Sequence, residues 1–248
     1  MYSFPKPNDW STLPLYTKIQ IYKTHLDERF SQFVDKLEAK KIVKEICGDT
    51  DKIHVANIVR ILESPEDIRE EDLQNTNCLL KATHGSGWNI QITEKTKIEL
   101  VKQKLHTWNT PYIGSNEKHY QYVKPRFFLE ECIEDAYGGE KGKAVVFMFR
   151  CIQGNAVTIG VKKGDEQNMY LITGECLGKA FPFVLPMHKI NEMKELAEKL
   201  SNPFEFVRID FYLGVKGEIY FSEYTFTPAG GQPIYSDAIE KYLGSLWT

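Results

Sequence analysis

The sequence lacks a surplus of charge of either sign, and it lacks any long apolar run. Its 31 Lys and Arg residues nearly balance 34 Asp and Glu residues, which leaves a net charge of −3 and an isoelectric point near 6.1. Proteins that coat nucleic acid usually carry a basic excess, so we expect no nucleic-acid partner. The longest compact apolar run, residues 144–149, is far shorter than the ~18 residues of a membrane helix. The first seven residues contain no apolar signal core, so we expect neither an integral membrane protein nor an exported one.

Metal-binding and disulfide patterns are also missing. The five cysteines form no C-x-x-C pair, the six histidines form no H-x-x-x-H pair, and no N-x-S/T sequon occurs. We therefore expect free thiols, a cytoplasmic location and no zinc site. The phosphate-binding motifs G-x-x-x-x-G-K-S/T and G-x-G-x-x-G are absent too, which argues against a P-loop or a Rossmann site.

The chain does contain enough apolar residues, 42% of its 248, for a substantial core in one large domain or two small lobes. Apolar residues recur at helical spacing over 18–47, where we expect one long helix or two consecutive helices that stop at Cys47-Gly48. Helical and strand patterns are mixed along the chain, so we expect an α+β fold. The other expected helices cover 94–108, 188–200 and 235–246, and the expected strands cover 54–62, 78–83, 88–93, 126–133, 144–152, 155–161, 206–213 and 218–226.

A lysine followed by a glycine turn, Lys81 with residues 84–87, is the first candidate for chemistry. A lysine within an apolar strand is unfavourable unless it finds a partner, and a glycine turn offers unobstructed backbone N–H groups to phosphate oxygens. An ordinary hairpin with an outward-pointing lysine explains the same pattern.

Two acids on neighbouring strands, Asp210 and Glu223, are the second candidate. With a tight turn at 216–217, we expect Asp210 to pair close to Phe221, with Glu223 diagonally nearby. Converging carboxylates repel unless a cation lies between them, and their hard oxygen atoms suit Mg²⁺. A simple ion pair from Arg208 to either acid is the alternative.

The third candidate is the strand over 126–133, because a strand that leads into a loop beside apolar walls can offer backbone groups to adenine. The order of these features resembles the ATP-grasp superfamily, and within it the TupA-like branch of teichuronopeptide biosynthesis. The stretches L-K-A-T-H-G-S-G-W-N and E-Y-T-F-T-P-A-G-G carry the resemblance, which extends from about Asp35 to the C-terminus.

The resemblance implies two α+β lobes that clamp ATP, with a helical arm over 1–34, a first lobe over 35–125 and a second over 126–248. It implies an ATP- and Mg²⁺-dependent ligase that joins a carboxylate to an amine through an acyl phosphate and produces ADP. The substrate implied is a cell-surface polysaccharide or its precursor. The oligomeric state is left open, with a homodimer among the options.

The resemblance also implies a role for each site residue. Arg208 and Lys81 are the expected catalytic residues, and Asp210, Glu223 and Thr225 are the expected metal ligands. The residues expected to bind ATP are Lys36, Lys81, His84, Gly85, Ser86, Gly87, Glu130, Glu131, Cys132 and Ile133.

Some positions depart from the pattern of the family. Thr225 stands where many ATP-grasp enzymes have asparagine, and Val146 and Met148 stand where TupA-like proteins have aspartate and lysine. The missing aspartate leaves Glu134, Asp135 or Glu140 to bind ribose. Two other functions stay open: a kinase that phosphorylates a hydroxyl, and a nucleotide-binding module without catalysis.

Overall fold

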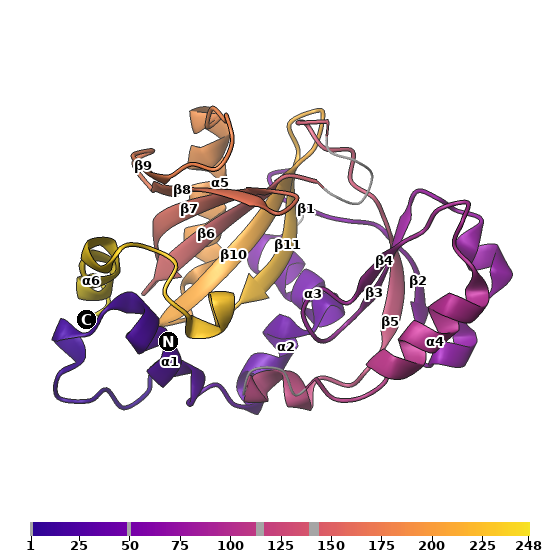
Figure 1. The fold of residues 1–248 in the computed structure, drawn as a ribbon, viewed down its shortest axis with the longest axis horizontal. Coiled ribbons are helices and arrows are strands. Elements are labelled where there is room, and N and C mark those ends of the chain that lie inside the picture. Colours follow the sequence, from indigo (N-terminus) through magenta and orange to yellow (C-terminus); the bar gives the residue numbers. More distant parts are fainter. Residues whose placement is uncertain (1, 49–50, 113–116, 139–143) are drawn as a thin grey trace.

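Two β-sheets form the framework of the computed structural model, which describes residues 2–48, 51–112, 117–138 and 144–248 (Figure 1). The larger sheet has seven strands and the smaller has four, and helices accompany both, so the expected α+β fold is confirmed. The larger sheet has the order β1 (His54–Val55), β11 (Ile219–Thr225), β10 (Phe206–Leu213), β6 (Val146–Ile152), β7 (Asn155–Lys163), β8 (Glu166–Leu171) and β9 (Cys176–Gly178). The smaller has the order β2 (Ile58–Leu62), β5 (Phe127–Glu131), β3 (Cys78–Ala82) and β4 (Asn89–Gln91).

The apolar run over 54–62 contributes to both sheets, so the expectation of a single strand was wrong. Its first part, β1, pairs in parallel with β11, whereas β2 pairs antiparallel with β5. The chain passes from one sheet to the other at residues 56–57. Strands β8 and β9 were not anticipated, while the hairpins β3–β4, β6–β7 and β10–β11 confirm the expected turns.

The helical pattern over 18–47 is broken into α1 (Leu15–Lys23), α2 (Ser31–Val34) and α3 (Lys36–Cys47). Asp35 begins α3, because its carboxylate accepts hydrogen bonds from the backbone N–H groups of Leu37 and Glu38. Gly48, at φ +73°, ends the helix at the predicted place. The remaining α-helices are α4 (Ile98–Trp108), α5 (Met187–Ser201) and α6 (Asp237–Ser245).

Alternation along β10 separates the hydrophobic core from the site. Val207, Ile209 and Phe211 are fully buried in the main core cluster, on the face that α5 covers. Arg208, Asp210 and Tyr212 point to the opposite face, toward the smaller sheet. The larger sheet therefore presents a polar face toward the smaller sheet.

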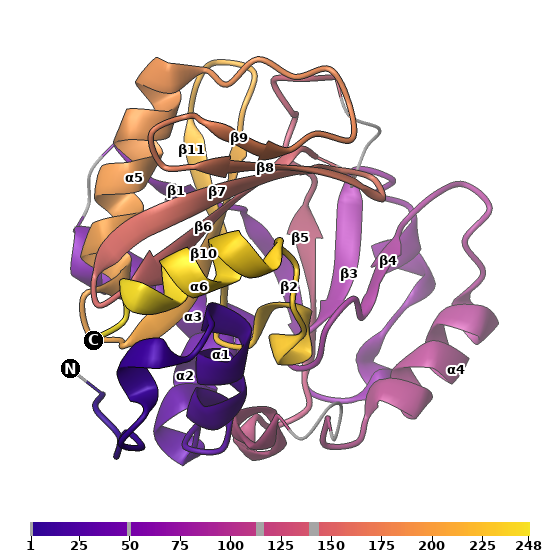
Figure 2. The ribbon, with the colours of Figure 1, turned by 60° about the vertical axis from the view of Figure 1, so that its left-hand side comes forward.

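The N-terminal segment packs into the core of the larger sheet together with the C-terminal helix. Helices α1 and α6 lie side by side, and both chain ends come close together (Figure 2). The Nζ of the fully buried Lys18 donates hydrogen bonds to the carbonyl oxygens of Gly244, at 2.8 Å, and Trp247, at 2.6 Å. Burial lowers the pKa of Lys18 to about 8.

We predict that Gly244→Ala destabilises the protein, although alanine normally favours a helix. A Cβ at Gly244 would lie 2.3 Å from the carbonyl oxygen of Leu13, a backbone atom that cannot move aside easily. Urea unfolding should show a loss of about 1–3 kcal/mol in the free energy of unfolding. Gly178→Ala is the control, because no atom lies within 4 Å of its added Cβ. A Gly244→Ala variant as stable as the wild type would contradict this packing.

Candidate active site

The register between β10 and β11 brings the two predicted acids together. Asp210 lies directly opposite Glu223, and Arg208 lies opposite Thr225. The expected pairing of Asp210 with Phe221 was wrong, for two reasons. Leu213 pairs with Ile219, and an irregularity after Asp210 leaves Ser222 as an extra residue in β11. Because opposite residues of an antiparallel pair share a face, all four polar side chains converge.

Arg208 joins these side chains into one cluster. Its Nε donates to Oδ1 of Asp210 at 2.7 Å and its Nη2 to Oδ2 at 2.6 Å, a bidentate pair. The same Nη2 lies 3.2 Å from Oε1 of Glu223 and 3.1 Å from Oγ1 of Thr225. The ion pair from Arg208, given above as the alternative to a metal site, is therefore present, and it holds both carboxylates in one place.

Burial sets the electrostatics of the cluster. Asp210 is 2% exposed, and burial raises its pKa to about 6, with a further contribution from Glu223 and an opposing one from Arg208. The negative charge on Asp210 therefore depends on a nearby cation. Two hard carboxylates and the hydroxyl of Thr225 are donors that suit Mg²⁺, so the residues present fit the metal.

A cavity of ≈ 410 Å³ separates this cluster from the smaller sheet. Lys36 and Lys81, both predicted, reach it from the side of the smaller sheet, and Ser86 and Gly87 of the glycine turn line it as well. The remaining described lining residues are Trp88, Asn89, Val146, Met148, Lys162, Gln167, Arg208, Asp210, Tyr212, Ser222 and Glu223.

Lys81 is held by a buried acid at the base of the smaller sheet. Its Nζ pairs with Glu130, and Lys40 Nζ of α3 lies 3.0 Å from the other oxygen of the same carboxylate. Burial alone would raise the pKa of Glu130, but the charges of Lys81 and Lys40 outweigh it and lower the pKa to about 2. Lys81 is thus fixed in its charged form, which favours a role toward an anion.

The glycine turn is fixed from two sides. Lys36 Nζ donates to the carbonyl oxygen of Gly85 at 2.8 Å. Gly85 adopts φ +76°, and a Cβ there would lie 2.9 Å from the Tyr112 ring, so glycine is required. His84, predicted to bind ATP, points elsewhere: it is fully buried, and its Nε2 lies 2.8 Å from the carbonyl oxygen of Trp108.

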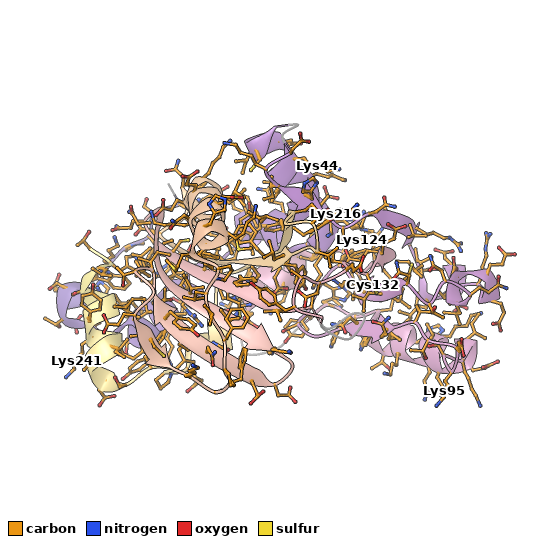
Figure 3. All side chains as sticks on the ribbon, turned by 90° about the horizontal axis from the view of Figure 1, so that it is seen from above. Lys44, Lys95, Lys124, Cys132, Lys216 and Lys241 are labelled. Carbon is orange, nitrogen blue, oxygen red and sulfur yellow. The ribbon has the colours of Figure 1, made fainter. Side chains whose placement is uncertain are left out.

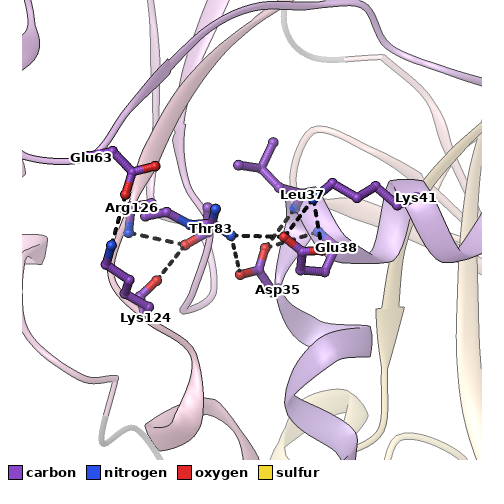
Figure 4. A network of polar contacts seen from close by, with 8 residues as sticks. All are labelled: Asp35, Leu37, Glu38, Lys41, Glu63, Thr83, Lys124 and Arg126. Carbon is purple, nitrogen blue, oxygen red and sulfur yellow. Dashed lines mark hydrogen bonds and ion pairs between the residues drawn. The ribbon is translucent and has the colours of Figure 1, made fainter.

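A second polar network holds the first turn of α3 against the smaller sheet (Figure 4). Arg126 Nη2 donates to Oδ2 of Asp35 at 3.1 Å and to Oε1 of Glu38 at 3.2 Å. The backbone N–H of Lys36 donates to the carbonyl oxygen of Thr83 at 3.0 Å. These contacts place Lys36 beside the glycine turn.

The predicted adenine segment, residues 130–133, connects the two sheets but does not line the described cavity. The N–H groups of Glu131 and Cys132 donate to the carbonyl oxygens of Asn57 and Asn77, and Figure 3 places Cys132 between the two sheets. Beyond this segment, the N–H of Ala136 donates to the carbonyl oxygen of Leu213, and the N–H of Val215 donates to that of Glu134. These bonds bring Glu134 and Asp135 to the end of β10. Glu140 lies outside the described residues.

Lys162 and Gln167 line the cavity and were not anticipated. They pair across β7 and β8, and Lys162 also lies opposite Val146. The sequence pattern ended the strand at Val161, two residues before its observed end at Lys163. A charged residue directly after an apolar strand was the available signal. Val146 and Met148 also line the cavity, as expected if they replace polar family residues.

Two further classes of feature are absent from the part of the chain that the structure describes. There is no group of three or more His, Cys, Asp or Glu side chains arranged to hold a metal, so any cation here relies on two carboxylates with other oxygens. None of the described helices combines the length and apolarity that crossing a membrane requires.

Comparison with known proteins adds an independent observation. A family model described as TupA-like ATPgrasp matches residues 16–248. No curated protein matches the chain.

Several solved structures are similar to the chain in fold. The ADP complex of purK, N5-carboxyaminoimidazole ribonucleotide synthetase, has a TM-score of 0.51 at 12% identity, covering 88% of this chain and 51% of that one. D-alanine–D-alanine ligase from Bacillus anthracis has a TM-score of 0.47 at 14% identity, covering 78% and 53%. The L-amino acid ligase from Bacillus licheniformis has 0.47 at 15%, covering 79% and 44%. This chain spans about half the length of these proteins.

We predict that Glu130→Gln lowers the free energy of unfolding by about 3–5 kcal/mol near pH 7, because it leaves two buried lysines without their acid. The exposed neighbour provides the control, and Glu131→Gln should change stability by less than about 0.5 kcal/mol. Urea unfolding measures both.

The difference in stability between the wild type and Glu130→Gln should depend on pH. The pKa of Glu130 is lowered from 4.5 to about 2, so its contribution to stability is present above pH 4.5 and is lost as the pH falls through 2. The difference between wild type and Glu130→Gln should shrink over that range. A difference that stays constant would contradict the ion-pair account.

Proposed function

Because the chain belongs to the TupA-like ATP-grasp family, we propose that it is an ATP- and Mg²⁺-dependent ligase that joins a carboxylate to an amine and releases ADP. One observation carries the proposal. An Arg–Asp–Glu cluster on the larger sheet faces two lysines and a glycine turn across one cavity. Cations, amides and positioned carboxylates are what phosphoryl transfer requires, and a nucleophilic side chain is not needed.

Asp210, Glu223 and Thr225 are the residues that would hold Mg²⁺. When bound, the metal neutralises phosphate charge and orients the phosphates for in-line transfer. Thr225 supplies a hydroxyl where many ATP-grasp enzymes supply an asparagine carbonyl. We therefore assign the two carboxylates the larger share of metal binding.

Lys36, Lys81 and the N–H groups of residues 85–87 would bind the phosphates from the smaller lobe. Backbone groups of Glu131 and Ile133 would meet the adenine, and Glu134 or Asp135 would serve the ribose. His84 would take part only by its backbone, because its side chain is used to anchor the turn to the end of α4.

Arg208 is the proposed catalytic cation. It lies among the metal ligands, with its guanidinium on the face that lines the cavity. From there it would stabilise charge that develops on the phosphoryl group as an acyl phosphate forms. An amine would then attack the acyl carbon and release phosphate.

The finer assignments rest on the family. We propose a cytoplasmic enzyme with lobes over 35–125 and 126–248 that acts on a cell-surface polysaccharide or its precursor. A carboxylate and an amine are the substrates to examine first.

One observation favours a nucleotide-binding module without catalysis. Val146 and Met148 present apolar side chains to the cavity at positions where the family has charged residues. Lys162, directly opposite Val146, provides a positive charge in the same cavity and favours the enzyme.

We predict that the protein with ATP, Mg²⁺ and a panel of acids and amines forms ADP, free phosphate and an amide. A kinase would form ADP and a phosphorylated product without free phosphate. Nucleotide binding without turnover in the presence of any acid or amine of the panel would contradict the proposal of a ligase. Coupled ADP and phosphate assays with mass spectrometry of the products distinguish these outcomes.

We also predict that Asp210→Asn weakens Mg²⁺-dependent ATP binding by about 100-fold, which corresponds to about 2.7 kcal/mol. Asp165→Asn, in the exposed turn after β7, removes the same charge and should bind as the wild type does. Isothermal titration with ATP, with and without Mg²⁺, measures the change. Equal affinities for the two variants would contradict the metal assignment.

A further inference from the structure

Arg150 lies on the same face of the larger sheet as the catalytic cluster. It is on β6, directly opposite Arg208 of β10 on one side and Thr158 of β7 on the other. Opposite residues in antiparallel strands have Cα atoms about 4.5–5.5 Å apart. Two arginines are therefore immediate neighbours at one end of the site.

The guanidinium of Arg150 has few partners, in contrast to that of Arg208. Arg150 is 3% exposed, and its Nε and Nη1 atoms are buried without a hydrogen-bond partner among the described residues. Its guanidinium carbon lies 5.5 Å from the centre of the Tyr235 ring. Burial lowers the pKa of Arg150.

Neighbouring acids do not satisfy this charge. The carboxylate of Asp210 is engaged by Arg208 through two hydrogen bonds. The carboxylate of Glu240 accepts backbone N–H groups of Tyr16, Ile234 and Tyr235, and it makes no ion pair with Arg150. An unpaired buried guanidinium is costly, by several kcal/mol, unless an anion joins it.

The order of the residue pairs between β6 and β10 indicates what that anion is. Val146 pairs with Tyr212 and Met148 with Asp210, and these four residues line the proposed nucleotide cavity. Arg150 and Arg208 form the next pair, farther from the segment that joins the two sheets. If the nucleotide base lies at the joining segment, this pair lies beyond the phosphates, where the group that receives the phosphoryl must be.

The ring of Tyr235 covers the guanidinium of Arg150 and is anchored to the neighbouring strand β7. Its hydroxyl lies 3.0 Å from Oγ1 of Thr158. Tyr235 belongs to the short segment 232–236 before α6, in which the other residues are exposed. Moving the Tyr235 ring aside breaks this hydrogen bond and its packing against the main core cluster, whereas the backbone is held by the N–H bonds of Ile234 and Tyr235 to Glu240.

We propose that Arg150, together with Arg208, binds the carboxylate of the acceptor substrate after Tyr235 moves aside. The inference rests on the proposed function, because the nucleotide defines which end of the row receives the acceptor. Two guanidinium groups from adjacent strands can donate hydrogen bonds to both carboxylate oxygens, and they leave the Asp210–Glu223 pair to the metal.

The test uses the dicarboxylate glutarate as the probe and isothermal titration as the measurement, with and without MgADP. Arg150→Met should bind glutarate at least about 10-fold more weakly than the wild type, a loss of about 1.4 kcal/mol. Arg150→Lys should retain part of the affinity. Lys163→Met removes an exposed charge from β7 and should bind glutarate as the wild type does.

A structural role for Arg150 would give different results. The proposal expects Arg150→Met to unfold at the same temperature as the wild type or higher, because it replaces an unpaired buried charge with an apolar chain. Three results would overturn the proposal. They are equal glutarate affinity in Arg150→Met and wild type, no glutarate binding by the wild type, and binding of inorganic phosphate alone. MgADP affinity, titrated separately, tests the proposed function and should be unchanged in Arg150→Met.

Discussion

The register between β10 and β11 is the constraint on which the site depends. Side chains alternate between the two faces of a strand, so a shift of one residue would turn Glu223 away from Asp210. The extra residue Ser222 sets this register and places both acids and Thr225 around Arg208. The hydrophobic residues of β10 fix the opposite face against α5, so the cluster is anchored by the core itself.

Helix α3 contacts the two sheets in different ways. Its apolar side packs on β11 and α5 of the larger sheet. Its polar side reaches the smaller sheet, where Lys40 pairs with Glu130 and Lys36 binds the carbonyl oxygen of Gly85. Because Glu130 also holds Lys81, one buried carboxylate links the position of the helix to that of the lysine proposed to bind phosphate. Helix α3 thus ties the smaller sheet to the larger one through polar contacts on one side and apolar contacts on the other.

Much of the fold could be predicted from local patterns, because turns such as 153–154 and a stop such as Gly48 are encoded within a few residues. The family was predicted from two motifs, and the match over 16–248 confirms it. Features that depend on contacts between distant segments could not be predicted from the sequence. Whether 54–62 serves one sheet or two, and whether Glu223 faces Asp210, depend on pairing with distant strands. His84 was assigned to ATP because its neighbours are, but its environment comes from the distant end of α4.

Paramagnetic Mn²⁺, added with ADP in place of Mg²⁺, tests the central claim most directly. The claim is that the register of β10 and β11 builds a metal centre opposite Lys36 and Lys81. In a ¹⁵N-labelled protein, the account predicts that nucleotide-dependent broadening is strongest for the amides around Asp210 and Glu223 and extends to residues 85–87. Broadening centred elsewhere, or broadening that does not require the nucleotide, would contradict it.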